Sequence, residues 1–471
     1  MRLVPVLVAI VVVSSLPLAA GCDPRVLADT GIVPEQGCLL DVEHFSAVSV
    51  EPTGVPTVFE ARWSTAEPGQ GHVIFSVDDA QWSTTAKGSA GTEHQAMLVG
   101  SPALSEVQVR LVNDVDGELL CSGSYARSTP APPPELPELV LDDAYNGAGP
   151  LGWSLVPIGS EVTSVPAVVD AQGRYCWWLQ DDGYYFYVDL APDGRGLLLL
   201  DSPSQADGPG RIVDVGFDGE LRDERFVDGA HNHLVKTLDG SIYVLGHESY
   251  EVEIEGEPIA MVSDTVVELL PDGEQAVLWS ARDTLYDSMY SMILQRAAAG
   301  GPGEVDWTHG TTLAYHEQSD RLVVALTGAN TVMGLDRSTG SVDWVMGGDA
   351  STLAGSRELV RIPHSVHVYD DRVLLYNQRS VRDGEECGEA AEIMLDLDAS
   401  AAHLNWFVRE PDCGISDVMG SAYRTADGGT LMAGGSLGRL SWFDPSGELT
   451  WRLTGDVGTT FGGTTHVAAF R

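Results

Sequence analysis

The chain has 471 residues, which is too long for one ordinary domain and fits a small domain joined to a larger one. It carries 26 Lys and Arg residues against 69 Asp and Glu residues, for a formal net charge of −43. Such an acidic excess argues against nucleic acid or an anionic membrane surface as a partner, because both would repel the protein.

The first 22 residues have the layout of a secretory signal. Arg2 precedes an apolar run from Leu3 to Val13, and small residues lead to Cys22. This ending also resembles a bacterial lipobox, so Cys22 is the expected lipidation site, with plain cleavage to a soluble periplasmic form as the alternative. No later stretch reaches the roughly 18 apolar residues of a membrane helix. We therefore expect an exported protein, periplasmic or lipid-anchored to the bacterial cell envelope, whose only membrane contact is this anchor.

The cysteines fit an oxidising compartment. Cys38 with Cys121 and Cys387 with Cys413 are the natural disulfide pairs, because each pair lies within one expected domain. Cys176 would then remain as a buried thiol. The sequence contains no CxxC or HExxH pattern, so it offers no zinc signature and predicts no metal site.

Three regions follow the signal. Residues 23–128 are expected to form a small β-sandwich of the fibronectin type III kind, because short alternating strands such as VPTVFEARWST and SEVQVRLVN are separated by Pro and Gly turns. Residues 129–138 contain a proline run, which predicts an extended linker with few contacts between the domains. Residues 139–471 form the third region.

The third region repeats a four-strand unit and shows no long helical periodicity. One half of the unit closes on an aromatic residue, as in VMGLDRSTGSVDW, and the other half is a strand, an Asp-Gly type turn and an apolar strand, as in HLVKTLDGSIYVL. The second halves are assigned to 164–180, 233–246, 309–327, 364–377, 421–434 and a truncated unit from His466 to the end. Six units predict an all-β fold, a six-bladed β-propeller in which an N-terminal strand of the propeller completes the last blade.

Histidines recur where these second halves begin. His233 and His364 each lie six residues before the turn aspartate, His309 is assigned the same place before a longer hairpin, and His466 opens the last unit. Each position begins the inner strand of a blade, so a closed ring would gather the side chains at one mouth of the central channel. This recurrence predicts a functional cluster. The other propeller histidines are interpreted as structural or surface residues: His231, His247, His316, His367 and His403.

These segments resemble bacterial arylsulfate sulfotransferases, which are six-bladed propellers preceded by a small β-sandwich. The resemblance covers nearly the whole mature chain and is most specific in HNHLVKTLDGSIYVL, VDWTHGTTLAYHEQSDRLVVAL, TVMGLDRSTGSVDWVMGG and IPHSVHVYDDRVLLYNQR. It implies that His364 is the transiently sulfated residue and that His233 and His309 are further active-site histidines.

The sequence departs from the family at one position. Family members have an arginine shortly after the Asp-Trp-x-His hairpin, and the resemblance implies that it holds the sulfuryl oxygens, whereas Thr327 stands there in this chain. Arg361 and Arg379 flank the hairpin of His364 and are the candidates to replace it. Together with Thr327 and His466 they are the candidate substrate-binding residues.

The resemblance predicts transfer of a sulfuryl group from a phenolic sulfate ester to a phenolic acceptor, through a sulfohistidine on His364. His309 and His233 would stabilise the transferring oxygens and protonate the departing phenolate. No GxxxxGK[ST] loop occurs, so neither a nucleotide donor nor a cofactor is expected. Two alternatives stay open. One is a non-catalytic envelope propeller that binds an anionic or aromatic ligand or acts as a scaffold; the other is a quinoprotein-like propeller, prompted by the strands GSVDW and GELTW.

Overall fold

The computed structural model describes residues 38–471 except 79–82, 160–163, 203–207, 238, 255, 271, 300–303, 383, 469 and 471. The expected signal segment and the lipidation site Cys22 lie outside the described residues. Within the described part of the chain, no helix combines the length and the apolar character that crossing a membrane would need.

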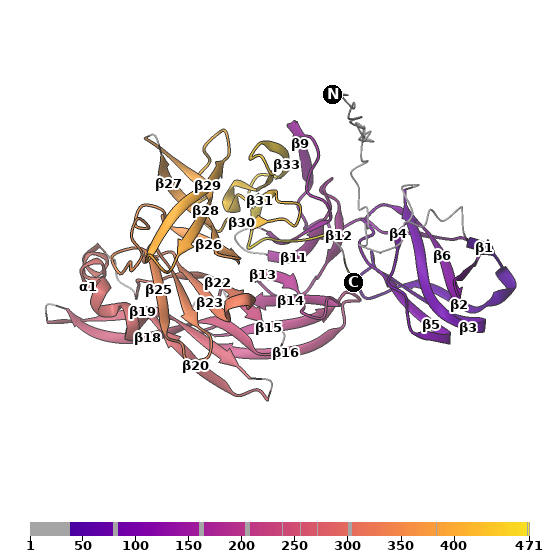
Figure 1. The fold of residues 1–471 in the computed structure, drawn as a ribbon, viewed down its shortest axis with the longest axis horizontal. Helices are drawn as coiled ribbons and strands as arrows, with labels where there is room; N and C mark the ends of the chain where they lie inside the picture. Colours follow the sequence, from indigo (N-terminus) through magenta and orange to yellow (C-terminus); the bar gives the residue numbers. More distant parts are fainter. Residues whose placement is uncertain are drawn as a thin grey trace, which may run out of the picture.

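Residues 38–128 form a small all-β domain beside the rest of the molecule (Figure 1). Its long strand β3 pairs with β2 and β5 through its first half and with β6 through its second half, so the two halves enclose one apolar core that includes Trp63 and Phe75. The predicted Cys38–Cys121 disulfide is confirmed and joins the parallel strands β1 and β7. The elements are β1 (Cys38–Leu40), η1 (Val42–His44), β2 (Phe45–Pro52), β3 (Phe59–Val77), β4 (Ser83–Thr84), β5 (Ala90–Leu98), β6 (Glu106–Val115), β7 (Glu118–Cys121) and β8 (Tyr125–Ser128).

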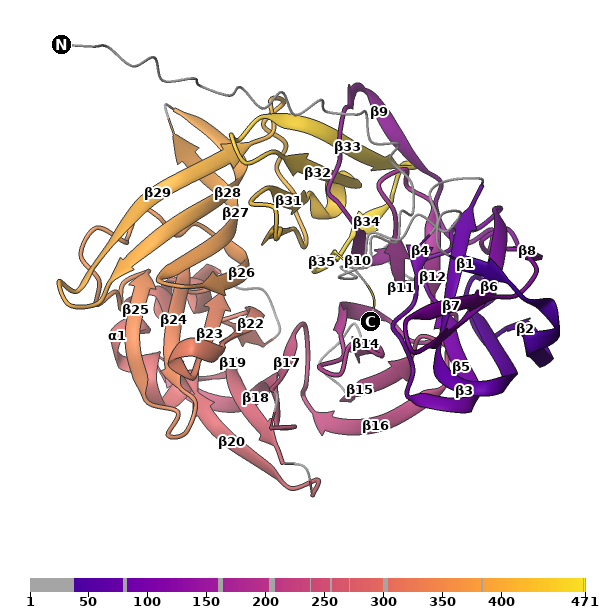
Figure 2. The same ribbon diagram turned by 45° about the vertical axis from the view of Figure 1, so that its right-hand side comes forward.

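Six sheets arranged around a central channel make up the remainder, and the predicted six-bladed propeller is confirmed (Figure 2). The first four blades of the ring are numbered here in chain order. Blade 1 contains β10 (Trp153–Gly159), β11 (Ser164–Val169) and β12 (Tyr175–Trp178); blade 2 contains β13 (Tyr185–Leu190), β14 (Gly196–Asp201), β15 (Pro209–Gly216) and β16 (Leu221–Asp228). Blade 3 contains β17 (Leu234–Lys236), β18 (Ile242–Ile254), β19 (Glu257–Leu269), β20 (Gln275–Ser280) and β21 (Val305–Asp306); blade 4 contains β22 (Gly310–His316), η2 (Glu317–Ser319), β23 (Arg321–Leu326), β24 (Thr331–Asp336) and β25 (Val342–Gly347).

The last two blades complete the ring. Blade 5 contains β26 (Pro363–Tyr369), β27 (Arg372–Arg382), β28 (Glu385–Asp396) and β29 (Ala401–Arg409), and the predicted Cys387–Cys413 disulfide anchors the end of β28. Blade 6 contains β30 (Ser421–Arg424), β31 (Thr430–Ala433), η3 (Gly435–Leu437), β32 (Arg439–Phe443) and β33 (Leu449–Gly455), with β9 (Leu139–Asn146) as a fifth strand.

The ring closes between the two ends of the propeller. The C-terminal strands β34 (Thr460–Phe461) and β35 (Thr465–Val467) pair antiparallel with β10 and so supply the inner side of blade 1. At the other edge, β9 pairs with β33 on the outside of blade 6. Both pairings bury strand edges that would otherwise be open, as the truncated last unit predicted.

Two of the sequence-based assignments within the blades were wrong. One outer hairpin was counted as a blade of its own and one inner hairpin was missed, so the total of six was still correct. The hairpin at 164–180 is β11–β12, the outer half of blade 1, whereas the inner hairpin of blade 2, β13–β14, was not recognised. Outer hairpins can carry the same turn chemistry as inner ones, as Asp170 shows. The missed hairpin turns at Asp193, and the residue six positions earlier is Tyr187 rather than a histidine.

One element was not predicted at all. Helix α1 (Ala281–Ala299) lies between β20 and β21 and packs on blades 3 and 4. Its buried face is a single stripe in which every fourth residue points inward, while polar and apolar residues alternate on the remaining surface and hide the helical pattern in the sequence. The stripe consists of Ala281, Leu285, Met289 and Ile293.

The two domains share more buried surface than a proline linker leads one to expect. Val58 of the small domain belongs to the same core cluster as Trp153 and Trp177 of blade 1. In the linker, Leu136 is 9% exposed and packs in the core of blades 1 and 6. The expectation of few contacts is therefore wrong, because apolar side chains at the boundary are buried against the propeller.

Candidate functional site

A cavity of about 330 Å³ occupies the central channel of the propeller. All six blades contribute to its wall through their innermost segments. Of the four histidines predicted to gather at one mouth, His233 and His364 line this cavity, whereas His309 and His466 do not. The aromatic rings in the wall come from Phe186, Tyr187, Tyr315 and Tyr423.

His364 occupies an unpaired position at the start of the inner strand of blade 5. In the β26–β27 ladder Pro363 faces Asn377 and Ser365 faces Tyr376, so His364 is the extra residue of a β-bulge. Such bulges turn a side chain away from the regular alternation of the strand and occur often beside active sites. Here the bulge presents a half-buried imidazole to the cavity.

Threonine hydroxyl groups of blade 4 hold the backbone on both sides of this bulge. The Oγ1 of Thr327 donates a hydrogen bond to the carbonyl of Pro363 at 2.5 Å, and the Oγ1 of Thr311 donates to the same carbonyl at 3.2 Å. The Oγ1 of Thr312 donates to the carbonyl of His364 at 2.9 Å. Thr327 therefore positions the strand that carries His364, in the place where the family arginine was expected.

His309 does not have the register that the sequence indicated. The corresponding bulge residue of blade 4 is Thr311, because Gly310 faces Leu326 and Thr312 faces Ala325. His309 lies two residues earlier, just before β22, with a φ of 47° in the left-handed region. Its side chain is 54% exposed. The histidine thus stands outside the cavity wall, on the turn that leads into the channel.

The turn places His309 against a carboxylate. The Nδ1 of His309 lies 2.6 Å from Oδ2 of Asp306, and its backbone N–H donates to Oδ1 of the same residue at 2.9 Å. This hydrogen bond raises the pKa of His309, although burial opposes the rise. The arrangement favours an imidazolium whose Nε2–H is left to interact with other groups.

The two cavity histidines have the opposite electrostatic character. Burial lowers the pKa of His364 to about 4, with the charge of His309 as a smaller cause. Burial also lowers the pKa of His233 to about 3, and its ring packs 4.1 Å from the ring of Tyr187. Both imidazoles are neutral near pH 7. Of the proposed acid groups, only His309 has an environment that favours the protonated form.

His367 was expected to point away from the channel and does not. It lines the cavity together with His364, and its ring stacks on Tyr423 with the centroids 4.4 Å apart. Its Nδ1 accepts a hydrogen bond from the backbone N–H of Arg424 at 3.2 Å. The bulge at His364 breaks the two-residue alternation on which the expectation depended.

The arginines and His466 that were candidates for substrate binding lie outside the cavity wall. Arg361 pairs with Glu358 at 2.6 Å and is 46% exposed, and Arg379 is 43% exposed. His466 is 8% exposed, with Nε2 2.7 Å from the carbonyl of Leu151. Among the residues that the structure describes along this wall, Lys236 is the only lysine or arginine, and it pairs with Asp214 at 3.0 Å. The structure therefore brings neither Arg361 nor Arg379 into the described cavity wall.

Several residues of the site were not identified from the sequence. Asp306, Thr311 and Thr312 act through contacts that depend on the bulge and the left-handed turn. Asn232 lies in the cavity wall, and its Nδ2 donates to the carbonyl of Gly310 at 2.7 Å, which links blade 3 to blade 4. For Asp306 a signal did exist, since an acidic residue three positions before a histidine can reach its ring through a tight turn.

Two findings bear on the class of this protein. The fold is a six-bladed propeller whose channel holds neutral histidines, with an Asp–His pair beside the channel. Residues 144–356 match the model of the arylsulfotransferase (ASST) family. This segment of the chain is therefore similar to arylsulfotransferases. The matched segment contains His233 and His309 and ends before His364.

Comparison with individual proteins gives distant relatives. Arylsulfate sulfotransferase AssT of Lelliottia amnigena is 23% identical over 249 residues, which cover 44% of this chain and 39% of that protein. The chain thus spans about two fifths of the length of this curated relative.

Solved structures with similar folds show low overall similarity. A protein of unknown function from Bacteroides caccae is 12% identical, with 84% of this chain and 98% of that chain covered and a TM-score of 0.30. AztD from Citrobacter koseri is 10% identical, with 84% and 98% covered and a TM-score of 0.29. Virginiamycin B lyase from Staphylococcus aureus is 10% identical, with 67% and 88% covered and a TM-score of 0.36.

Proposed function

We propose that the protein is an arylsulfate sulfotransferase that transfers a sulfuryl group between phenolic oxygens through a sulfohistidine on His364. The observation that carries the proposal is the state of this side chain. His364 is the bulge residue of β26, faces the channel cavity, and has a pKa lowered to about 4. An unprotonated imidazole nitrogen is therefore available as a nucleophile near pH 7.

The first half-reaction forms an N–S bond and breaks an S–O bond. A ring nitrogen of His364 attacks the sulfur of the aryl sulfate ester, and the electron pair of the S–O bond leaves with the phenolate oxygen. His309 donates the proton that this oxygen takes up, because its hydrogen bond to Asp306 keeps the imidazole protonated. His233 is neutral and can donate one hydrogen bond to a sulfuryl oxygen.

The second half-reaction is the reverse with another phenol. The acceptor gives its hydroxyl proton to His309, its oxygen attacks the sulfur on His364, and the N–S electron pair returns to the imidazole. No nucleotide or cofactor is needed for this balance. The rings of Phe186, Tyr187 and Tyr423 in the cavity wall offer apolar surface on which a phenyl group can pack.

We further propose that a phenolic sulfate donor and a phenolic acceptor are the partners, and that the protein acts after export, in the periplasm or lipid-anchored at the cell envelope. The confirmed disulfides support an oxidising compartment.

A second candidate function rests on the missing arginine. Because the described cavity wall has Lys236 as its only lysine or arginine, the site offers little charge to stabilise a transferring sulfuryl group. The alternative is a binding protein that holds an aromatic or anionic ligand in the same cavity without turning it over.

One experiment separates the two functions. Purified protein is incubated with 4-nitrophenyl sulfate and phenol, nitrophenolate release is followed, and the peptide that contains His364 is examined by mass spectrometry. The transferase predicts release, together with a gain of about one sulfuryl group on this peptide, and both should be lost in His364→Ala. His316→Ala is the matched control, because His316 lies at the far end of β22 and outside the cavity wall. Binding without release or label in the wild type would favour the second function.

A further inference from the structure

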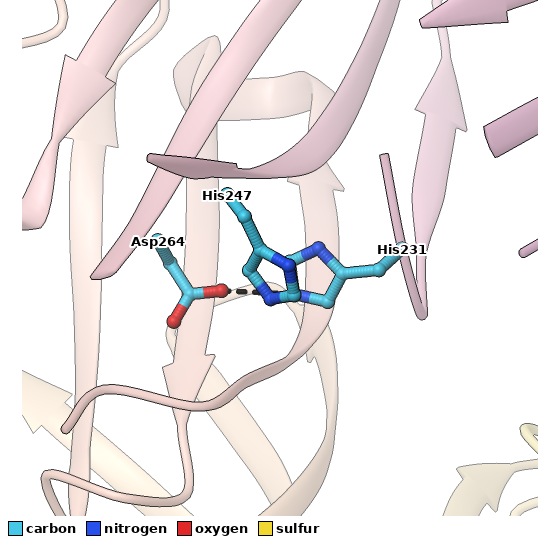
Figure 3. Close-up of side chains that lie close together, drawn as sticks. All are labelled: His231, His247 and Asp264. Carbon is cyan, nitrogen blue, oxygen red and sulfur yellow. Dashed lines mark ion pairs between the residues drawn. The ribbon is translucent and has the colours of Figure 1, made fainter. Parts of the chain in front are cut away.

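A second group of histidines lies in blade 3, outside the cavity wall. His231, His247 and Asp264 converge so that one ligand atom from each lies within 4.8 Å of the other two (Figure 3). Asp264 is fully buried and His231 is 8% exposed, while His247 is partly exposed. None of these residues has a part in the proposed transfer reaction.

Strand pairing brings the three side chains together. His247 in β18 is directly opposite Asp264 in β19. The segment before β17 continues the same ladder, because the backbone N–H of His231 donates to the carbonyl of Leu245 at 3.0 Å. The backbone N–H of His247 donates in turn to the carbonyl of Gly229 at 3.1 Å. Three neighbouring backbone segments therefore each present one metal-ligating group at the same place, and the backbone determines this placement.

The other polar atoms of His231 and Asp264 are already occupied. The Nδ1 of His231 lies 3.2 Å from the carbonyl of Gly229, which can only accept a hydrogen bond, so a neutral His231 that donates there has its lone pair on Nε2 for a metal ion. Oδ2 of Asp264 accepts from the backbone N–H of Gly310 at 2.7 Å and from the hydroxyl of Thr308. Such outer hydrogen bonds orient the ligands of protein metal sites.

The two ligand atoms that remain face each other. Nε2 of His231 and Oδ1 of Asp264 lie 2.9 Å apart. A buried imidazole nitrogen and a buried carboxylate oxygen at this distance share a cation, either a proton or a metal ion, because two unprotonated acceptors would repel each other. The partly exposed imidazole of His247 adds a third possible ligand atom beside this pair.

We propose that His231, His247 and Asp264 form a binding site for one divalent transition-metal ion of the zinc type. Two neutral imidazoles and one carboxylate are a donor set that suits such ions, and three protein ligands leave a position for water. Tetrahedral bonds of about 2.1 Å place ligand atoms about 3.4 Å apart, so binding of an ion requires His247 to move closer to the other two ligands and Nε2 of His231 to move slightly away from Oδ1 of Asp264.

The position of the site gives the ion a structural consequence. Asp264 contacts Thr308 and Gly310, the residues on both sides of His309. A Cβ at Gly310 would lie 2.6 Å from Oδ1 of Asp264, so this position accepts no side chain while the carboxylate keeps its orientation. The ion would therefore connect blade 3 to the turn that carries His309.

The test is a titration of the tag-free full chain with Zn²⁺ after treatment with a chelator, followed by isothermal calorimetry. The acidic surface will bind Zn²⁺ weakly at many places. The expected result is therefore one Zn²⁺ ion bound tightly per chain (one tight equivalent), above this weak background. His247→Ala should weaken that equivalent by more than the roughly 10–100-fold typical for loss of an outer hydrogen-bond partner. His316→Ala removes a histidine elsewhere and should leave it unchanged.

A second measurement does not depend on a variant that folds. With Co²⁺ in place of Zn²⁺, the wild type should show the visible absorption of a Co²⁺ ion with a low coordination number. X-ray absorption spectroscopy should detect scattering from imidazole ligands. Absence of a tight equivalent in the wild type would overturn the proposal and leave a proton-bridged His–Asp pair. Unchanged tight binding in His247→Ala would overturn it too, because the ion would then lie elsewhere.

Discussion

The Nδ1 of His309 lies 2.6 Å from Oδ2 of Asp306, on a turn whose backbone at His309 is left-handed. A φ of 47° is unusual for a histidine, and strained backbone of this kind is often kept at functional sites. The carboxylate and the turn together give His309 a raised pKa while the two cavity histidines have lowered ones. In the proposed reaction, this difference in pKa would separate the proton donor His309 from the nucleophile His364.

Replacement of Asp306 should move the pH dependence of turnover. The reaction needs neutral His364 and protonated His309, so the rate should fall below about pH 4, the pKa of His364, and again above the raised pKa of His309. Asp306→Asn removes the hydrogen bond that raises the pKa of His309, so the alkaline limb of the kcat profile should shift to lower pH. The acidic limb should stay, because His364 does not contact Asp306. An alkaline limb that does not move would rule out His309 as the acid.

Replacement of Thr327 should affect turnover through the position of His364. Thr327→Val keeps the shape of the side chain and removes the hydrogen bond to Pro363, which should cost about 1 kcal/mol of stability. We expect kcat to fall and KM to change little, because the nucleophile is displaced while the aromatic wall remains. Thr352→Val is the control, since Thr352 bonds to Val345 instead. Equal effects of both variants on kcat would show that Thr327 has no special role.

Thr327→Arg tests whether an arginine at this position, as in the family, increases turnover. If the chain lost activity when it lost the family arginine, this variant should gain turnover of 4-nitrophenyl sulfate relative to the wild type. The new side chain must find space beside Pro363, so calorimetric unfolding should be compared to establish that the variant folds. A folded variant that stays inactive would favour the binding function.

The buried neutral histidines should make the fold sensitive to acid. The pKa values of His233, His364 and His367 are lowered to about 3, 4 and 4, below the ordinary value of 6.5. Each therefore contributes stability that is present above about pH 6.5 and is lost as the pH falls toward its folded value. The loss is at most about 1.4 kcal/mol per pH unit for each group. His309 has a raised pKa and acts in the opposite sense, since its contribution is lost as the pH rises.

Urea unfolding between pH 7 and pH 4 measures this effect. The free energy of unfolding should decrease over the range, and His367→Phe should make the decrease less steep, because a phenyl ring can stack on Tyr423 without a proton to gain. A free energy that is constant over this range would contradict the buried, neutral state of these side chains.

The linker should resist proteolysis in the native protein, contrary to what a proline run by itself indicates. Leu136 is buried against the propeller, and the hydroxyl of Tyr175 donates to the carbonyl of Pro137 at 2.7 Å. Leu136→Asp should expose residues 129–138 to cleavage. Val140→Asp is the control, because Val140 is 53% exposed in β9. Rapid cleavage of the wild-type linker would mean that these contacts open readily.

The sequence predicted the state of some cysteines but not of all. Membership in one expected domain was enough to predict the Cys38–Cys121 and Cys387–Cys413 disulfides, which are confirmed. Cys176 was expected to be a thiol, but it is disulfide-bonded.

The sequence by itself determined the architecture and much of the chemistry of this protein. Turns and apolar strands recur in the blades because each blade packs its strands in the same way, so the propeller and its closure could be predicted from local patterns. The count of six agreed only because one missed hairpin offset one wrongly assigned hairpin. The same repetition located His233 and His364, since equivalent positions of the blades meet at one mouth.

Only the tertiary structure decided how these side chains are used. The bulge at His364, the left-handed turn at His309 and the cavity-facing position of His367 depend on pairing with neighbouring strands, which no local pattern records. The cluster of His231, His247 and Asp264 is the clearest case, because its three ligands come from three backbone segments and have no spacing motif in sequence. Local sequence determines the shape of a blade. The distances between the side chains of a site are determined by the pairing of strands and the packing of blades that bring these side chains together.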